Sequence, residues 1–347
     1  MTATVTISIE IELGWGVHDL GEYDHLSDGG QEERRYLRKL LGACDTHRIP
    51  ISFDVVGHLF LEECSGSHPG PYADGWFEAD PGTDSETDPL FYAPDVVDEI
   101  VARRTDHELC THTFSHVLCD EESEELQRED LRYSQYLHER DVGEQTESLV
   151  PPRHYGPSPD ALRDQGIEIV RVPTDESHAT GIGRFRELLF GPPPVRTPKI
   201  EDGIVETYCT SHPTLTAASL PSGQRNTHVA FRWLPVRLRR RLHDRYLRTA
   251  VETAIEDDSS LHVWCHLYDL SNEYQFPQIE SFLAVLASLR ENDDVVIKTM
   301  SDLNEDARAG QPSSTKVGVD QKRTEEENPA EDVKPDAEQK QEADRRV

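Results

Sequence analysis

Apolar and polar residues alternate in several short segments of the chain, and longer segments carry apolar residues at helical spacing. Residues 5–11 alternate strictly, with Val or Ile at every odd position and polar residues at the even ones. Strands are predicted over residues 5–11, 50–60, 108–110, 147–150, 168–172, 261–264 and 295–299. Helices are predicted over residues 31–46, 95–104, 122–139, 160–164, 237–255 and 278–291. Strands that alternate with helices indicate βα units, and therefore an α/β fold with a parallel sheet or barrel.

Two segments depart from this pattern. Residues 76–90 are rich in Asp, Gly and Pro and are predicted to form an inserted loop. From residue 304 onward, Glu, Asp, Gln, Lys and Pro dominate and large apolar side chains are almost absent. We therefore expect one folded domain over residues 1–303 and a disordered acidic tail over residues 304–347.

The charge of the chain changes how its acidic residues are interpreted. The 347 residues include 67 Asp and Glu against 35 Lys and Arg, a formal net charge of −32. This excess argues against nucleic acid as the main partner, because phosphate binding needs clustered cations. The hypothesis that fits it is a protein of an extreme halophile, in which molar salt screens the repulsion between carboxylates. In such a protein an exposed acidic residue carries little functional information.

The expected location is the cytoplasm. No run of 18 apolar residues is present, and the first residues contain neither a basic region nor a cleavable apolar segment. Six cysteines occur without a CxxC pair, and in a reducing compartment they are expected to be small buried side chains rather than disulfides.

Two short segments carry candidate metal ligands. Glu10 and Glu12 share one face of the first strand, which is either an exposed acidic face or the mouth of a barrel. His112 and His116 are spaced so that one turn of chain could bring both imidazoles to a divalent metal. With a carboxylate they would form a three-ligand site that leaves a position for water. Taken alone, this histidine spacing is a weak signal.

Three further segments stand out. Arg153 lies in a proline-rich turn that would hold it in place, unless the segment is an ordinary surface turn. His266 ends an apolar strand, and Asp269 follows it closely enough to orient its ring. The segment 232–248 carries seven arginines; these either pair with the protein's own carboxylates or bind an anionic partner such as a phospholipid surface or a diphosphate-linked glycan.

In this order, the motifs resemble those of the polysaccharide deacetylase family, the NodB-homology carbohydrate esterases. His112-Thr-Phe-Ser-His116 resembles the metal-binding motif of that family, and residues 8–16 resemble its acidic first strand. Residues 50–58, Pro152-Arg153 and residues 261–270 resemble its second-strand, arginine and last motifs. The resemblance covers about residues 4–303 and implies a distorted (β/α)-barrel of seven or eight strands. For the fourth motif, Asp175 is a candidate only.

Carried over to this chain, the resemblance implies a hydrolase that removes N-acetyl groups from an amino-sugar glycan or its precursor. It implies that a divalent metal, zinc first, is bound by Glu12, His112 and His116. Glu10 would be the general base, held by Arg153, and His266 the general acid. Tyr155, Trp15 and Asp269 would line the substrate site, with a backbone N–H near Tyr155 or Gly156 at the oxyanion.

The chain departs from the family at the base position. The family usually has Asp there, and Glu10 is one methylene longer. A displacement of about 1 Å of a catalytic group can cost on the order of 100-fold in rate. Two alternatives therefore stay open: a weak or silent protein that binds glycan or metal, and a hydrolase of a non-sugar amide.

Overall fold

A computed structural model describes residues 2–174, 182–191, 193–211, 215, 231 and 233–310. Within these residues, seven parallel strands close into a barrel, which confirms the expected fold class. Around the barrel the strands follow the order β2, β3, β4, β5, β7, β8 and β1, and each strand pairs with the next. β1 also pairs with β2, which closes the barrel. The barrel strands are β1 (Ala3–Ile11), β2 (Ser52–Val55), β3 (Glu108–Thr111), β4 (Ser148–Leu149), β5 (Ile169–Pro173), β7 (Ile204–Ser211) and β8 (Ser260–His266).

Two more strands lie beside the barrel. β9 (Val295–Ile297) pairs with the first residues of β1, whereas β2 pairs with the last ones, so the two strands share one edge of β1. β6 (Lys199–Glu201) pairs antiparallel with β7. The sequence pattern predicted neither β6 nor β7. Ile204 and Val205 of β7 are neighbours that point to opposite faces, and both are buried, so no exposed polar face marks the strand.

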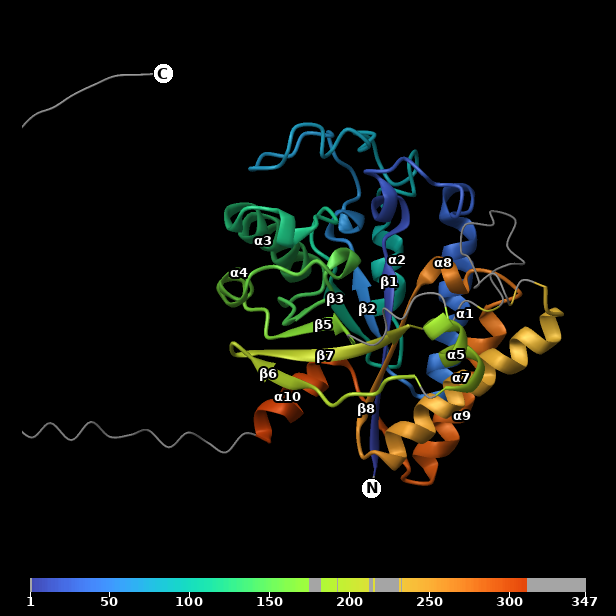
Figure 1. Ribbon diagram of the computed structural model, residues 1–347. Coiled ribbons are helices and arrows are strands. Elements are labelled where there is room, and N and C mark those ends of the chain that lie inside the picture. Colours follow the sequence, from blue (N-terminus) through green and yellow to red (C-terminus); the bar gives the residue numbers. More distant parts are fainter. Residues whose placement is uncertain are drawn as a thin grey trace, which may run out of the picture. The chain divides into compact units, whose positions relative to one another are not determined.

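Helices surround the strands (Figure 1). Their apolar faces pack on the outer side of the barrel, where the odd-numbered residues of β1 join the main apolar core. The helices are α1 (Gln31–His47), α2 (Pro94–Val101), α3 (Glu124–Asp141), α4 (Pro159–Asp164), α5 (Ile182–Phe190), α7 (Val236–Glu256), α8 (Leu267–Leu270), α9 (Phe276–Glu291) and α10 (Met300–Ala309). Short 3-10 turns are η1 (Leu13–Val17), η2 (Asp28–Gly30), η3 (Gly57–Phe60), η4 (Cys119–Glu121) and η5 (Pro152–His154).

The folded domain extends past the boundary expected at residue 303, because it includes helix α10. The helix begins with a capping box between Thr299 and Asp302 and runs to Ala309. The backbone N–H groups of Met300 and Ser301 donate to the carboxylate of Glu108 on β3, at 2.8 and 3.1 Å. The helix is thus part of the folded unit. Of the predicted tail, residues 304–309 are therefore helical, and the part from residue 311 onward lies outside the described residues.

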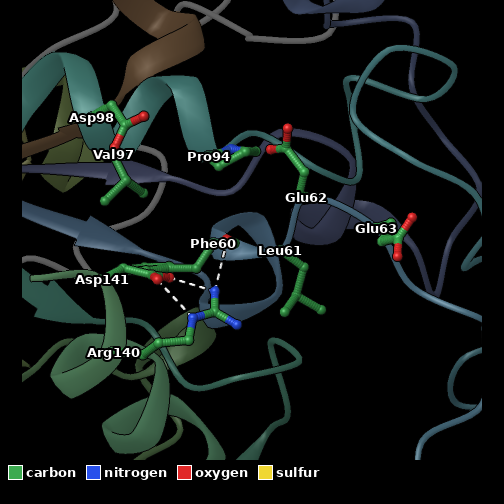
Figure 2. A pocket seen from close by; sticks show the side chains of 9 residues that line it. All are labelled: Phe60, Leu61, Glu62, Glu63, Pro94, Val97, Asp98, Arg140 and Asp141. Carbon is green, nitrogen blue, oxygen red and sulfur yellow. Dashed lines mark hydrogen bonds and ion pairs between the residues drawn. The ribbon is translucent and has the colours of Figure 1, made fainter.

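A long connection joins η3 to α2. Residues 61–93 contain only turns, bends and an isolated bridge between Glu63 and Asp84, so the inserted loop is longer than the sequence indicated. It is drawn in light blue at the top of Figure 1, at the end of the barrel toward which β1 runs. A pocket of about 510 Å³ lies where this loop leaves η3, lined by Phe60, Leu61, Glu62, Glu63, Pro94, Val97, Asp98, Arg140 and Asp141 (Figure 2).

The arginine-rich segment forms the start of α7, and its arginines differ in exposure. Arg239 is buried and donates to the carbonyl oxygens of Leu234 and Leu215. Arg232 lies outside the described residues. Four arginines at helical spacing are exposed on one face, namely Arg237, Arg241, Arg245 and Arg248. An anionic partner for this face remains a prediction. No described helix is long and apolar enough to cross a bilayer.

Candidate metal and catalytic site

The polar face of β1 points into the barrel. Glu10 has 4% of its surface exposed and Glu12 has 7%, so the alternative of an exposed acidic face is excluded. Glu10 is the last but one residue of the strand and lies beside His266, the last residue of β8, and Glu12 directly precedes η1. Two carboxylates therefore lie at the carboxyl ends of the barrel strands, where binding sites of such folds form.

Glu12, His112 and His116 converge at this end of the barrel. The Nε2 atoms of both histidines lie 3.1 Å from the same oxygen, Oε1 of Glu12. Both imidazoles belong to the turn that follows β3, in which Thr113 and His116 have positive φ angles of 61° and 59°. The structure brings together the three side chains that the sequence suggested as ligands.

Hydrogen bonding indicates that these three groups suit a cation. Nδ1 of His112 lies 2.7 Å from the carbonyl oxygen of Val150, which can only accept, so Nδ1 carries the proton. In the neutral ring, Nε2 then presents a lone pair to the lone pairs of Glu12. That arrangement is favourable only with a proton or a metal ion between them. One carboxylate oxygen and two imidazole nitrogens are a donor set that zinc accepts, with a further position left for water.

The backbone around Glu12 is shaped to admit its side chain. A Cβ atom at Gly16 would lie 2.1 Å from Oε2 of Glu12, so only glycine leaves room for the carboxylate. Burial alone would raise the pKa of Glu12, but the nearby His266 and His116 hold it well below its usual range. The carboxylate is therefore ionised, as a ligand must be.

Arg171 of β5 is the arginine that pairs with Glu10. Its Nη2 donates to Oε1 of Glu10, and its Nη1 donates to the hydroxyl of Ser8 at 2.8 Å and to Oδ2 of Asp54 at 3.2 Å. The prediction that Arg153 holds this carboxylate is wrong. Arg153 instead pairs with Asp19 at 2.7 Å at the partly exposed rim.

The signal for Arg171 was present in the sequence. It is a single charged residue within an apolar strand, and such a residue must find a buried partner. The family resemblance instead indicated Arg153, which lies in the proline-rich turn. Asp175, the candidate for the fourth motif, lies outside the described residues.

His266 contacts both acidic residues. Its Nε2 lies 2.8 Å from Oε2 of Glu10 and 3.8 Å from Oε1 of Glu12, while Nδ1 lies 3.4 Å from Oδ2 of Asp269. The ring of Tyr268 stacks on it with centroids 4.5 Å apart. Asp269 is buried, in keeping with orientation of His266 rather than contact with a substrate.

Trp15 and Tyr155, the other two residues expected to contact a substrate, differ in exposure. Trp15 is completely buried and packs on His58 and Phe91, so its assignment to substrate binding is corrected to a packing role. Tyr155 is 40% exposed and stays a candidate. Its backbone N–H donates to the carbonyl of Pro152 at 2.9 Å, which leaves Gly156 as the candidate oxyanion donor.

Asp130 holds the histidine turn and was not identified from the sequence. It accepts from the backbone N–H of Phe114 at 2.7 Å and from the hydroxyls of Ser115 and Tyr72 at 2.6 and 3.2 Å. Burial raises the pKa of Asp130 to about 6, although these three donors lower it. It lies in a helix rich in Glu and Asp, where sequence alone offers no signal.

The space next to the site is small. A cavity of about 390 Å³ adjoins it, lined by His18, Asp19, Gly21, Tyr23, Ala73, Asp74, Gly75, Trp76, Glu78 and Ala79. The ring of His18 lies 6.4 Å from that of His116, so the cavity borders the histidine turn. The larger pocket of Figure 2 contains none of the groups described in this section.

Comparisons with known proteins agree with this architecture. No protein-family profile and no curated sequence matches the chain. Among solved structures, one described as a polysaccharide deacetylase from Mycobacterium smegmatis is 15% identical, with a TM-score of 0.58 over 89% of this chain and 91% of that one. A second so described, from Pseudomonas aeruginosa PAO1, is 13% identical, with a TM-score of 0.56 over 89% and 92%. An allantoinase is 12% identical, with a TM-score of 0.55 over 89% and 91%. The chain has the fold of these hydrolases.

Proposed function

We propose that this protein is a metal-dependent hydrolase that removes an acyl group, in the first place acetyl, from the amide nitrogen of an amino sugar. The observation that carries the proposal is the convergence of Glu12, His112 and His116 beside Glu10 and His266. In the cytoplasm, such an enzyme would act on a biosynthetic intermediate of a surface glycan rather than on a finished polymer. A divalent metal, zinc in the first place, would polarise the amide carbonyl and lower the pKa of a bound water.

The residues around the ligands would handle the protons. Glu10 accepts the proton of the attacking water at its carboxylate, and Arg171 fixes the orientation of that carboxylate. Because Nε2 of His266 lies 2.8 Å from Glu10, it is placed to pass a proton to the departing amine nitrogen. Asp269 orients the imidazole through Nδ1.

The alternative of a weak or silent protein has its own structural support. Each oxygen of Glu10 already contacts a cationic or potentially cationic side chain, one Arg171 and the other His266. Hydrogen bonds to the ionised form stabilise it and so weaken the base. Glu10 is also one methylene longer than the Asp that the family usually has at this position, and a displaced base lowers the rate.

An acetate-release screen on N-acetylated sugars, run at molar KCl together with elemental analysis, separates these alternatives. We expect turnover by the wild type, loss of about 100-fold or more in Glu10→Ala, and partial activity in Glu10→Asp. Glu12→Ala and His112→Ala should each lose one equivalent of metal and all turnover.

Three results would count against parts of the proposal. An inactive wild type with an active Glu10→Asp variant would identify a silent protein. Activity on a non-sugar amide alone would identify the other alternative. Full metal occupancy in both Glu12→Ala and His112→Ala would show that the ligands are misassigned.

A further inference from the structure

A second group of metal-ligating side chains lies outside the candidate site. It consists of His58 in η3 and three residues of the long connection, namely Cys64, His68 and Asp80. One ligand atom from each lies within 4.8 Å of all the others. Cys64 is also the one cysteine that is not buried, contrary to the packing role expected for all six.

We propose that these four side chains bind a zinc ion that holds the 61–93 connection in place. The donor set is one sulfur, two imidazole nitrogens and one carboxylate oxygen, which matches zinc and disfavours magnesium and calcium. Four protein ligands fill a tetrahedral site, so this would be a structural ion without an open position for water. The proposal does not depend on the hydrolase function.

The distances between the ligand atoms suit one ion. Nε2 of His58 lies 3.3 Å from Nε2 of His68 and 3.2 Å from Oδ2 of Asp80, and Sγ of Cys64 lies 3.3 Å from Nε2 of His68. With zinc–ligand bonds of about 2.0–2.3 Å, tetrahedral ligands lie roughly 3.3–3.7 Å apart. The pair formed by His68 and Asp80, at 2.6 Å, must widen by less than an ångström.

The surroundings orient each ligand toward the centre. Nδ1 of His58 lies 3.2 Å from the carbonyl of Phe91, which makes Nδ1 the protonated nitrogen and turns the lone pair of Nε2 inward. The backbone N–H of Gly66 donates to Sγ of Cys64 at 3.3 Å, a contact that stabilises a thiolate.

The fourth ligand has its other oxygen occupied. Tyr92 and the backbone N–H of Gly82 both donate to Oδ1 of Asp80, which leaves Oδ2 for the metal. Without a cation, the lone pair of the buried Nε2 of His58 would face the lone pairs of Oδ2 of Asp80 at 3.2 Å, which is unfavourable. A metal ion resolves this arrangement.

The two clusters are connected through packing. The ring of His58 packs in a tilted arrangement on that of Trp15, with centroids 4.2 Å apart, and Trp15 lies three residues after the metal-ligand candidate Glu12. The backbone N–H of His58 donates to the carbonyl of Phe114 at 2.9 Å, within the histidine turn. The connection also carries Trp76, whose indole N–H donates to the hydroxyl of Ser115 at 3.1 Å. An ion at the second cluster would therefore fix a loop that contacts the histidine turn of the first.

Zinc titration of the metal-free full-length protein tests the proposal. We expect two equivalents in the wild type, one in a His112→Ala, His116→Ala double variant, and one in a Cys64→Ser, His68→Ala double variant. With cobalt(II), a thiolate-to-metal charge-transfer band should appear, vanish in Cys64→Ser and persist in the control Cys44→Ala. A single equivalent in the wild type, lost with the His112 and His116 replacements, would overturn the second site while leaving the first intact.

A measurement on the wild type covers the case in which the Cys64 variants do not fold. Zinc should slow alkylation of Cys64 by at least about tenfold, because only the free thiolate reacts. Mapping of the modified peptide identifies the residue. An unchanged alkylation rate at saturating zinc would rule the site out. The same protection should persist in the His112→Ala, His116→Ala variant, so the result is independent of the hydrolase proposal.

Discussion

The guanidinium of Arg171 is completely buried inside the barrel and bonds to the carboxylate of Glu10, 161 residues earlier in the chain. Burial favours the neutral carboxyl, but Arg171 and His266 hold the pKa of Glu10 well below its usual range. Asp54 takes a second N–H of the same guanidinium, so one cation serves two acidic side chains in a space closed to water.

Arg171→Gln should destabilise the protein far more than Arg153→Gln. Removing Arg171 leaves a buried carboxylate without its partner, a loss of about 3–5 kcal/mol in the free energy of unfolding. Arg153 pairs with Asp19 at the partly exposed rim, and its loss should cost less than about 1 kcal/mol. Denaturant titration at molar KCl measures both, and a Glu10→Gln replacement added to Arg171→Gln should restore part of the stability. Equal losses for the two arginines would contradict the assignment.

Asp54 should make stability depend on pH. Burial raises the pKa of Asp54 to about 7, and nearby Glu10 adds to the rise, although Arg171 opposes it. The folded state therefore holds a proton that the unfolded chain releases near pH 4, so this contribution is lost as pH rises from about 4 to 7. One pKa unit corresponds to about 1.4 kcal/mol, so Asp54→Asn should remove a loss of roughly 3–4 kcal/mol over that window. Unfolding curves at pH 5 and pH 8 test this, and identical pH dependence in both proteins would refute it.

Asp130 should control zinc affinity at the histidine turn. Replacing it by Ala removes the acceptor for Phe114 and Ser115, and loss of such supporting contacts costs about 10–100-fold in metal affinity. Glu129→Ala is the matched control, because that neighbour is half-buried at the helix surface and pairs there with Arg132. Competition with a chromogenic chelator in a Cys64→Ser, His68→Ala background reports on this site alone. The same affinity in both variants would exclude the role.

The melting temperature should rise when KCl is increased from dilute to molar. A net charge of −32 makes the folded state repel itself, and at 1 M salt the screening length falls to about 3 Å. Calorimetry across a KCl series, with sucrose as an uncharged control, measures the effect. A melting temperature that fell with KCl would refute adaptation to high salt.

Local patterns determined much of this protein. The alternation in residues 5–11 predicted both the strand and the common face of Glu10 and Glu12, because side chains in a strand alternate regardless of what surrounds it. The histidine spacing and the motif order indicated the ligands Glu12, His112 and His116, which converge in the structure.

Tertiary structure alone decided the partners of these residues. The sequence motifs suggested Arg153 as the partner of Glu10, but closure of the barrel places Arg171 within bonding distance and Arg153 at the rim. The cluster of His58 and Cys64 had no recognisable spacing, since an irregular loop brings its members together. Spacing along the chain predicts contacts within one strand or turn, whereas contacts across a barrel depend on how all its strands pair. The sequence by itself therefore determined which face carries the chemistry, and the fold decided which charges meet there.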